Sequence, residues 1–361
     1  MSDVLIAGGG VVGLSIAWEL AGAGLKVCVL DQSKIGQEAS WAGAGMIPPG
    51  DLNHHATHQL AALSAQLWPT LSSVLKSETG LDNGYALCGG LLLADSRPVE
   101  EISRAWKQLH VQAEIIHGAQ LRFREPGLSV SVDAGVWMPE MAQVRNPWHV
   151  KALQAACRMR GVELHPGERV LGWDVEKNRL RQAITESGRF SAAEFIIACG
   201  AWTAQLSALL GVRLPIEPVH GQMVLLQGDA PVFNRVIEQG GHYLVPRNDG
   251  RVLVGATEER LGFQKRNTPE VIARLREFAA GVVPALSEFP IEKTWSGLRP
   301  WSGLGHPSIG RVTDYQNLLL AAGHFRAGIS NSPGTALLLR ELIFDEPPTI
   351  DVADFDSADS A

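Results

Sequence analysis

The stretch "VLIAGGGVVGLSIAWELAGAGLKVCVLD", residues 4–31, decides the fold. It opens with a short apolar run typical of a buried parallel strand and closes with a second apolar run that ends in Asp31. Between them lies the pattern G-x-G-x-x-G, followed by apolar residues at helical spacing that stop at glycines. Strand, glycine-rich turn, helix and acid-terminated strand, in this order, predict a dinucleotide-binding unit.

Each part of this unit has a chemical purpose. Glycines let the backbone approach a pyrophosphate, the start of the helix faces the phosphates, and the terminal carboxylate accepts hydrogen bonds from ribose hydroxyls. A tight turn without a ligand is the alternative, and the complete pattern weighs against it. The pattern does not separate NAD from FAD. The dinucleotide contacts predicted here are Gly8, Gly10, Val11, Val12, Gly13, Asp31 and Gln32.

Bulk properties narrow the class of protein. A chain of 361 residues is long enough for two sizeable structural units. The net charge of −7 argues against nucleic acid or an anionic membrane as a main partner. The four cysteines form no Cys-x-x-Cys pair. The first apolar run lacks the basic residues that begin a signal sequence and is rich in glycine, and no other run is long and apolar enough to span a membrane. We therefore expect a cytoplasmic enzyme without an integral membrane segment.

The rest of the chain mixes helices with antiparallel strands. Residues 52–80 predict a long helix, and three histidines at its start, His54, His55 and His58, imitate metal-ligand spacing. We expect a solvated helix start there and no metal site. Residues 241–259 predict a hairpin that turns at 248–250, and a helix is expected to begin at Pro269. The predicted fold class is α/β, α+β overall, with a Rossmann-like domain and a second, largely antiparallel domain.

A family resemblance appears directly after the glycine-rich unit. The run "ASWAGAGM", residues 39–46, resembles the second flavin-contacting segment of the amino-acid oxidase superfamily that includes D-amino-acid oxidase, sarcosine oxidase and glycine oxidase. This resemblance implies FAD. None of the cysteines has sequence surroundings that resemble the site of covalent flavin attachment in monomeric sarcosine oxidase. The resemblance therefore implies that FAD is bound non-covalently. The further FAD contacts implied by the resemblance are Ala39, Ser40, Ala44, Gly45, Met46 and Val170.

Three polar residues later in the chain are candidates for substrate binding. Tyr243 lies on a predicted strand, where a half-buried sheet tyrosine is the alternative. Arg299 is biased to an extended conformation by Pro300, and its planar fork suits a carboxylate, although stacking on a tryptophan is equally open. Arg326 lies in a glycine-punctuated loop between a buried strand and a helix, where a cation needs an anionic partner.

Together these three residues sharpen the resemblance. Tyr243 in "YLVPR", Arg299 in "GLRP" and Arg326 in "GHFRAG" are similar to the glycine oxidase branch of the family, which is linked to thiazole (thiamine) biosynthesis. The similarity runs from the first strand to about residue 342. It implies that Tyr243 and Arg299 hold the substrate carboxylate and that Arg326 lies at the substrate. The loop expected to line FAD comprises His324, Phe325, Arg326, Ala327, Gly328, Ile329 and Ser330.

The activity implied by the resemblance is oxidation of glycine and other small amines. Hydride transfer from Cα to flavin N5 would give an α-keto acid and ammonia, with dioxygen reduced to hydrogen peroxide. A dehydrogenase of the same fold, a non-catalytic flavoprotein subunit and an NAD-binding dehydrogenase remain alternatives, and a homo-oligomer is left open. Two departures from the family pattern are His220 and Glu258, the latter at a position that is apolar in some relatives.

The predicted domains are discontinuous. The FAD-binding domain is expected to comprise residues 1–84, 146–214 and 296–345, and the substrate-binding domain residues 85–145 and 215–295. Residues 346–361 carry several acids and few packing residues, so we expect a disordered acidic tail.

Overall fold

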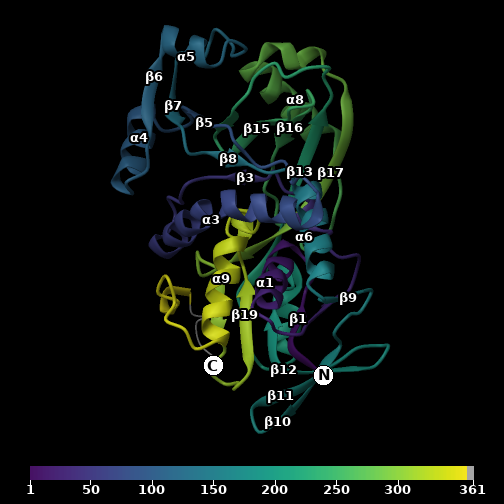
Figure 1. The fold of residues 1–361 in the computed structure, drawn as a ribbon. Helices are drawn as coiled ribbons and strands as arrows, with labels where there is room; N and C mark the ends of the chain where they lie inside the picture. The colour runs from purple at the N-terminus through teal and green to yellow at the C-terminus, as the bar shows by residue number, and fades with distance from the viewer. Residues whose placement is uncertain (356–361) are drawn as a thin grey trace.

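A computed structural model describes residues 1–355 of the chain. The molecule is elongated and is built around two large sheets, one toward each end, with the long helix α3 running between them (Figure 1). The N-terminus lies at the end that contains β1 and β12 (Figure 1). The combination of helices with a parallel and a largely antiparallel sheet confirms the predicted fold class.

The first sheet has five parallel strands in the order β9-β2-β1-β12-β19. An antiparallel hairpin, β10–β11, continues from β12, and β18 pairs with β19. Strands β1 and β2 each carry four consecutive buried residues, as expected for a parallel strand covered on both faces. The bounds are β1 Ser2–Ala7, β2 Val27–Asp31, β9 Glu163–Pro166, β10 Gly172–Glu176, β11 Arg179–Ile184, β12 Arg189–Ile197, β18 Ser308–Arg311 and β19 Leu318–Ala322.

Helices cover both faces of this sheet. On one face α1 packs against α6 and α9, and α3 packs against α6 and α9, around a core that includes Leu14, Leu60 and Leu339. On the other face α7 and the segment that follows it cover the core around Phe195. The bounds are α1 Val11–Gly22, α3 His55–Thr79, α6 Asn146–Met159, η1 Gly200–Trp202, α7 Thr203–Ala208, η3 Phe325–Ala327 and α9 Ser332–Ile343.

The second sheet has the order β17-β13-β16-β15-β14-β5-β7-β6, and only the β14–β5 pair is parallel. Helix α8 packs on one face, and α4 packs against β5, β6 and β7. The bounds are β5 Gly90–Leu93, β6 Glu114–His117, β7 Ala134–Met138, β13 Ile216–Leu226, β14 Val236–Gln239, β15 His242–Pro246, β16 Val252–Gly255, β17 Ile291–Ser302, α4 Val99–Gln108, α5 Gly118–Arg124, α8 Pro269–Val282 and η2 Pro284–Glu288.

Short elements complete the architecture. A three-stranded sheet contains β3 Met46–Ile47, β8 Ala142–Gln143 and β4 Ala86–Leu87, and α2 Ala39–Ala42 precedes it. Our two-domain division stays a proposal. One of its boundaries, between residues 295 and 296, falls inside the unbroken strand β17.

The predicted disordered tail differs from the structure over residues 346–355. The side-chain hydroxyl and backbone amide of Thr349 both donate to the carboxylate of Glu341 on α9. Phe355, in η4 Ala353–Phe355, is fully buried in the core of the first sheet. One large apolar residue therefore holds this segment on the protein despite its acidic composition. The remainder of the predicted tail, residues 356–361, lies outside the described residues.

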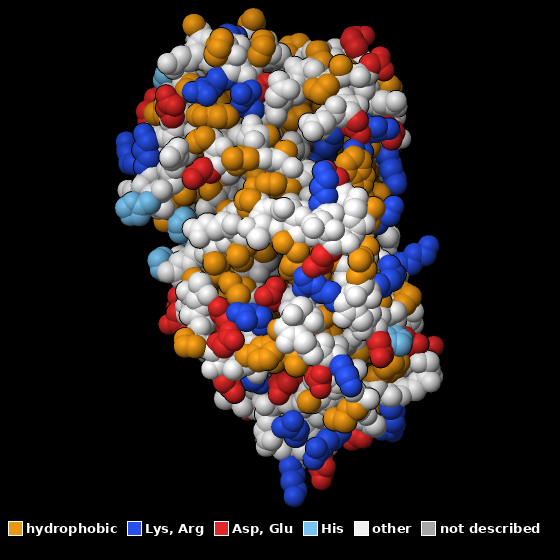
Figure 2. Space-filling view, in the orientation of Figure 1, with side chains coloured by type: hydrophobic (Ala, Val, Ile, Leu, Met, Phe, Trp, Pro, Cys, Tyr) orange, Lys and Arg blue, Asp and Glu red, His pale blue; other side chains and the backbone are white. Residues whose placement is uncertain are grey.

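The surface offers no large field of one sign on the face seen in Figure 2, where basic and acidic side chains are interspersed. The four cysteines are free. None of the helices in residues 1–355 is long and apolar enough to cross a membrane.

Candidate active site

One cavity of about 760 Å³ collects nearly all the predicted site residues. Its walls come from β1 and β2 of the first sheet, from β13, β14, β15 and β17 of the second sheet, and from the loop after β19. The predicted dinucleotide-binding and substrate-binding residues thus face one continuous space. Of the residues predicted from the sequence, Gly13 alone does not line it.

The glycine-rich turn is held where only glycine fits. Gly8 has φ +112°, and a Cβ there would lie 2.3 Å from the carbonyl oxygen of Ala198. A Cβ on Gly13 would lie 1.9 Å from the carbonyl oxygen of Gly8, so this third glycine brings α1 against β1. Helix α1 begins at Val11 with no acid in its first turn. The amide of Val11 donates to Oγ of Ser40 at 2.8 Å, and the positive end of the helix still borders the cavity, where an anion would be stabilised.

Asp31 fixes the neighbouring loop. Its carboxylate accepts hydrogen bonds from the amide of Gly9 at 2.8 Å and from the amide and hydroxyl of Ser33 at 2.8 and 3.0 Å. Because a carboxylate has about four acceptor positions, these bonds do not exhaust it. Asp31 can therefore anchor the turn and still accept from a ribose hydroxyl in the cavity.

The segment 39–46 and the loop after β19 approach each other closely. A Cβ on Gly43 would lie 2.9 Å from Cδ1 of Ile329, and one on Gly45 would lie 2.0 Å from the carbonyl oxygen of Val144. His324 is buried, and its Nε2 lies 3.0 Å from Oγ1 of Thr335. Burial lowers the pKa of His324 to about 4, so this histidine is neutral. The small residues and the neutral histidine make a wall suited to a flat, uncharged ring system.

These residues fit a flavin dinucleotide. The cavity has a helix start without an acidic residue for the pyrophosphate, a carboxylate for the ribose, and a wall of glycine and alanine for the ring. The wall also includes residues 198–202 and 168–171.

Tyr243 reaches the cavity from the middle of the second sheet. Its cross-strand neighbour on β16 is Gly255, and a Cβ there would lie 2.6 Å from the tyrosine ring. The missing side chain leaves room for the ring to lean over, so that its hydroxyl lies 3.3 Å from Sδ of Met223. Burial raises the pKa of Tyr243, although Arg299 acts in the opposite direction. The hydroxyl is therefore a protonated donor beside a weak sulfur acceptor.

Arg299 occupies a space left by another glycine. It extends from β17, and a Cβ on Gly221 of the paired strand β13 would lie 2.4 Å from its guanidinium. One guanidinium nitrogen donates to the carbonyl oxygen of Thr257 at 2.9 Å. The alternative was stacking on Trp301 or Trp295. Among the described residues Arg299 lies over neither ring, and the cation over Trp301 is Arg260. The remaining donors of Arg299 are available in the cavity.

Arg326 lines the cavity and pairs with an acid outside its wall. Its Nε lies 2.7 Å and its terminal nitrogen 2.6 Å from Oε1 of Glu258, and both side chains are close to half exposed. The partner of Glu258 is therefore Arg326, and the acid that departs from the family pattern forms an ion pair with this arginine. His220, the other departure, is fully buried and forms backbone hydrogen bonds with Glu259.

Among the acids of the cavity wall that sequence reasoning did not single out is Glu238. It lies on β14 directly opposite Tyr243 of β15. A glutamate in a short strand is usually solvent-facing. The available signal was the Gly240-Gly241 turn, which predicts a hairpin that places Glu238 opposite Tyr243. An ion pair between Asp95 and Arg97 also borders the cavity.

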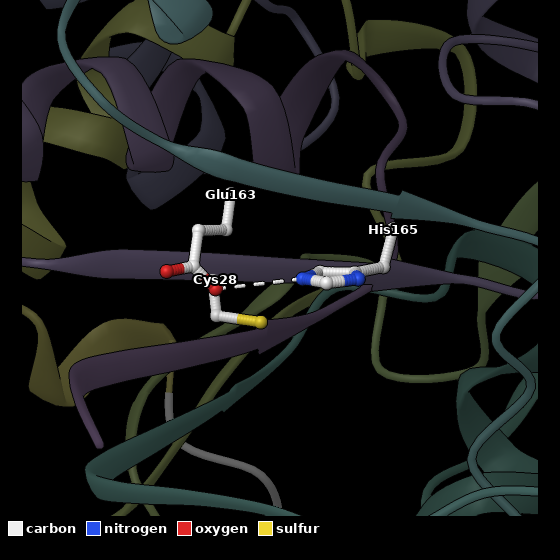
Figure 3. Close-up of side chains that lie close together, drawn as sticks. All are labelled: Cys28, Glu163 and His165. Atoms are coloured by element: carbon white, nitrogen blue, oxygen red, sulfur yellow. Dashed lines mark hydrogen bonds and ion pairs between the residues drawn. The ribbon is translucent and has the colours of Figure 1, made fainter. Parts of the chain in front are cut away.

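Within residues 1–355, one group of three side chains could hold a metal ion: Cys28, Glu163 and His165 (Figure 3). They lie on the adjacent strands β2 and β9, away from the cavity wall. Burial and Glu163 raise the pKa of Cys28 to about 12, which disfavours the thiolate that a metal requires. Of the three histidines at the start of α3, His54 serves as the cap and accepts from the amide of Ala56.

A model of the family described as "FAD dependent oxidoreductase" (DAO) matches residues 3–342. A glycine oxidase of Pseudomonas aeruginosa is 36% identical over 98% of this chain and 97% of its own. The bifunctional protein ThiO/ThiG of Trichormus variabilis is 35% identical over 95% of this chain, which spans 53% of that protein. The crystal structure of glycine oxidase from Geobacillus kaustophilus superposes with a TM-score of 0.94 at 30% identity, covering 99% of this chain and 98% of that one.

Proposed function

Because the chain belongs to the DAO family of FAD-dependent oxidoreductases, we propose that it oxidises glycine and other small amines, such as sarcosine and small D-amino acids. The products are an α-keto acid, ammonia and hydrogen peroxide; glycine gives glyoxylate. The observation that carries the proposal is the single cavity that Tyr243, Arg299 and Arg326 share with the dinucleotide-binding residues.

The cofactor contacts follow from the cavity wall. We assign the pyrophosphate to the turn at Gly8 and Gly10 with the start of α1, and the ribose to Asp31. The ring system belongs between segment 39–46 and the loop 324–330. Bound FAD supplies the acceptor for the hydride that leaves Cα of the amine, and dioxygen takes up the electrons afterwards.

The chain's own contribution is binding and orientation. Arg299 and Tyr243 together offer a charged fork and a neutral hydroxyl donor, which suits one carboxylate. Their donors come from two strands of one sheet, so the carboxylate is held on a rigid support. Arg326 contributes positive charge at the same cavity while its Nε is engaged by Glu258.

The test is an anaerobic screen in which glycine, sarcosine and small D-amino acids are mixed with the purified holoprotein. Bleaching of the flavin absorbance by glycine, followed by peroxide formation in air, is the expected result. Bleaching without reoxidation by air would instead assign a dehydrogenase that uses another electron acceptor. Retention of flavin without bleaching by any of the amines would assign a non-catalytic subunit and overturn the proposal.

The cellular role forms part of the same proposal. We infer that the enzyme feeds thiazole formation in thiamine biosynthesis, supported by the resemblance to glycine oxidases and by similarity to a protein named ThiO/ThiG. A cytoplasmic location is supported by four free cysteines, which are typical of a reducing compartment.

A further inference from the structure

The face of the second sheet that borders the cavity carries one acid in an otherwise uncharged row. The paired residues Leu92, Glu238, Tyr243 and Gly255 follow one another across β5, β14, β15 and β16. Residues opposite each other in a sheet point to the same face, so the Glu238 side chain lies beside the Tyr243 ring. Leu92, Glu238 and Tyr243 all line the cavity.

Glu238 differs from the other acids around it. Within residues 1–355 no hydrogen bond reaches its carboxylate, and the charges that act on it are those of Arg326, Arg97 and Asp95. Four further acids of the cavity wall accept hydrogen bonds from amides or side chains: Asp31, Glu38, Asp51 and Asp95. A carboxylate without a donor in a partly closed cavity is costly unless a ligand supplies one.

The charged groups near Glu238 indicate what kind of ligand would donate hydrogen bonds to its carboxylate. Arg326 is paired with Glu258, and Arg97 with Asp95. If a substrate carboxylate pairs with Arg299, Glu238 is the charge left without a partner. A cation with N–H donors completes the balance, and the ammonium group of an amino acid is such a cation.

We propose that Glu238 binds the ammonium group of the substrate and accepts its proton. This inference rests on the proposed amine oxidation. One N–H bond of the ammonium breaks, its electron pair stays on nitrogen, and the proton forms an O–H bond on the Glu238 carboxylate. The result is a neutral amine, whose lone pair favours departure of hydride from Cα. The proton passes to water after the product leaves.

The surroundings of Glu238 suit a proton acceptor. Burial raises its pKa, while Arg326 and Arg97 act in the opposite direction and Asp95 acts with burial. A raised pKa makes the carboxylate a stronger base. Tyr243, the other titratable neighbour, keeps its proton because burial raises its pKa too.

The test compares pH profiles of the holoenzyme and a Glu238→Gln variant. With glycine at pH 7.5 we expect kcat/KM to fall about 100-fold, a typical contribution of a general base. The deficit should shrink about tenfold per pH unit in alkaline buffer, because the variant needs amine that is already neutral. Affinity for glycolate, which has the carboxylate but no amine, should stay within about threefold of wild type or improve. Equal pH profiles in the two proteins would overturn the inference.

Two companion variants keep the outcome clear. Glu217→Gln removes an acid that pairs with Arg260 outside the cavity wall, and it should leave the pH profile unchanged. Glu238→Asp keeps the charge and should retain the wild-type pH dependence with a smaller loss; a profile like that of the Gln variant would count against a charge role. If the Gln variant does not retain flavin, this Asp variant carries the test. Failure of glycine to bleach the wild-type flavin would overturn the proposed function itself, whereas bleaching with unchanged variant profiles would overturn only the role of Glu238.

Discussion

Arg326 and Glu258, 68 residues apart in sequence, form an ion pair with Nε and Oε1 separated by 2.7 Å. Arg326 lines the cavity and Glu258 does not. The acid therefore lowers the positive charge that the cavity presents to a ligand without occupying the space that the ligand takes. We expect this pair to influence the choice among substrates more than the stability of the fold, because half-exposed pairs contribute at most about 1 kcal/mol.

Replacing Glu258 by Gln should shift preference toward amines with a second carboxylate. With Arg326 released, the ratio of kcat/KM for iminodiacetate or D-aspartate to that for glycine should rise about tenfold, equivalent to ~1.4 kcal/mol. Steady-state peroxide formation measures the ratio. Glu217→Gln is a matched control, since Glu217 pairs with Arg260 and does not line the cavity. An unchanged ratio in the Glu258 variant would show that Arg326 does not sense the substrate's charge.

Replacing Arg299 by Ala should weaken substrate binding far more than flavin binding. Loss of the guanidinium removes one side of a charge-assisted contact, worth about 2–4 kcal/mol, so KM for glycine should rise roughly 30- to 1,000-fold. Flavin absorbance per protein should stay near wild type. Arg260→Ala, which removes the arginine over Trp301, is the control and should behave like wild type. A normal KM in the Arg299 variant would contradict the carboxylate role.

How far the sequence could predict this architecture depends on whether the signal is local. The predicted strands and helix of residues 4–31 match β1, α1 and β2 because each carries its own periodicity and glycine boundaries. The predicted hairpin turn at 248–250 joins β15 to β16 for the same reason. Glu238 was missed although its pairing with Tyr243 is local, because the two residues flank the Gly240-Gly241 turn between β14 and β15. What the sequence does not tell is which face of this hairpin borders the cavity. The prediction of a disordered tail from residue 346 rested on average composition, which does not show the effect of a single residue. In the described part of that segment, the buried Phe355 fixes the chain on the core.

Gly13→Ala should damage the dinucleotide site through packing. The new methyl group would lie 1.9 Å from the Gly8 carbonyl oxygen, so α1 must move away from β1. We expect a loss of about 1–3 kcal/mol in the free energy of unfolding and a lower flavin content after purification. Thermal denaturation and flavin absorbance measure the two effects.

Gly281→Ala provides a matched glycine control with the opposite sign. Gly281 lies in α8 without a positive φ, and a Cβ there meets nothing within 4 Å. Alanine is the better helix former, so this variant should gain about 0.5–1 kcal/mol in stability with unchanged flavin content. A stable, fully loaded Gly13→Ala protein would contradict the close approach of α1 to β1.

Acid should destabilise the protein through histidines that are buried in their neutral form. His149 of α6 lies against the Trp68 ring of α3, with ring centroids 4.7 Å apart, and burial lowers its pKa from 6.5 to about 3. Below pH 6.5 the unfolded chain binds a proton that the folded chain excludes, so stability falls as the pH drops toward 3. Each such histidine contributes a slope of up to about 1.4 kcal/mol per pH unit. His324, with a pKa of about 4, acts in the same direction.

The variant His149→Gln isolates this contribution. Gln does not titrate, so the free energy of unfolding between pH 6.5 and pH 4.5 should fall less steeply than in wild type, by up to about 1.4 kcal/mol per pH unit. Its stability at pH 7.5 is expected to be lower, because Gln does not reproduce the packing of the imidazole against Trp68. Urea unfolding with saturating FAD, across this pH range, measures both effects. If the free energy of unfolding depended on pH equally in wild type and His149→Gln, protonation of His149 would not be coupled to unfolding. Acid sensitivity would then have a cause other than this buried neutral histidine.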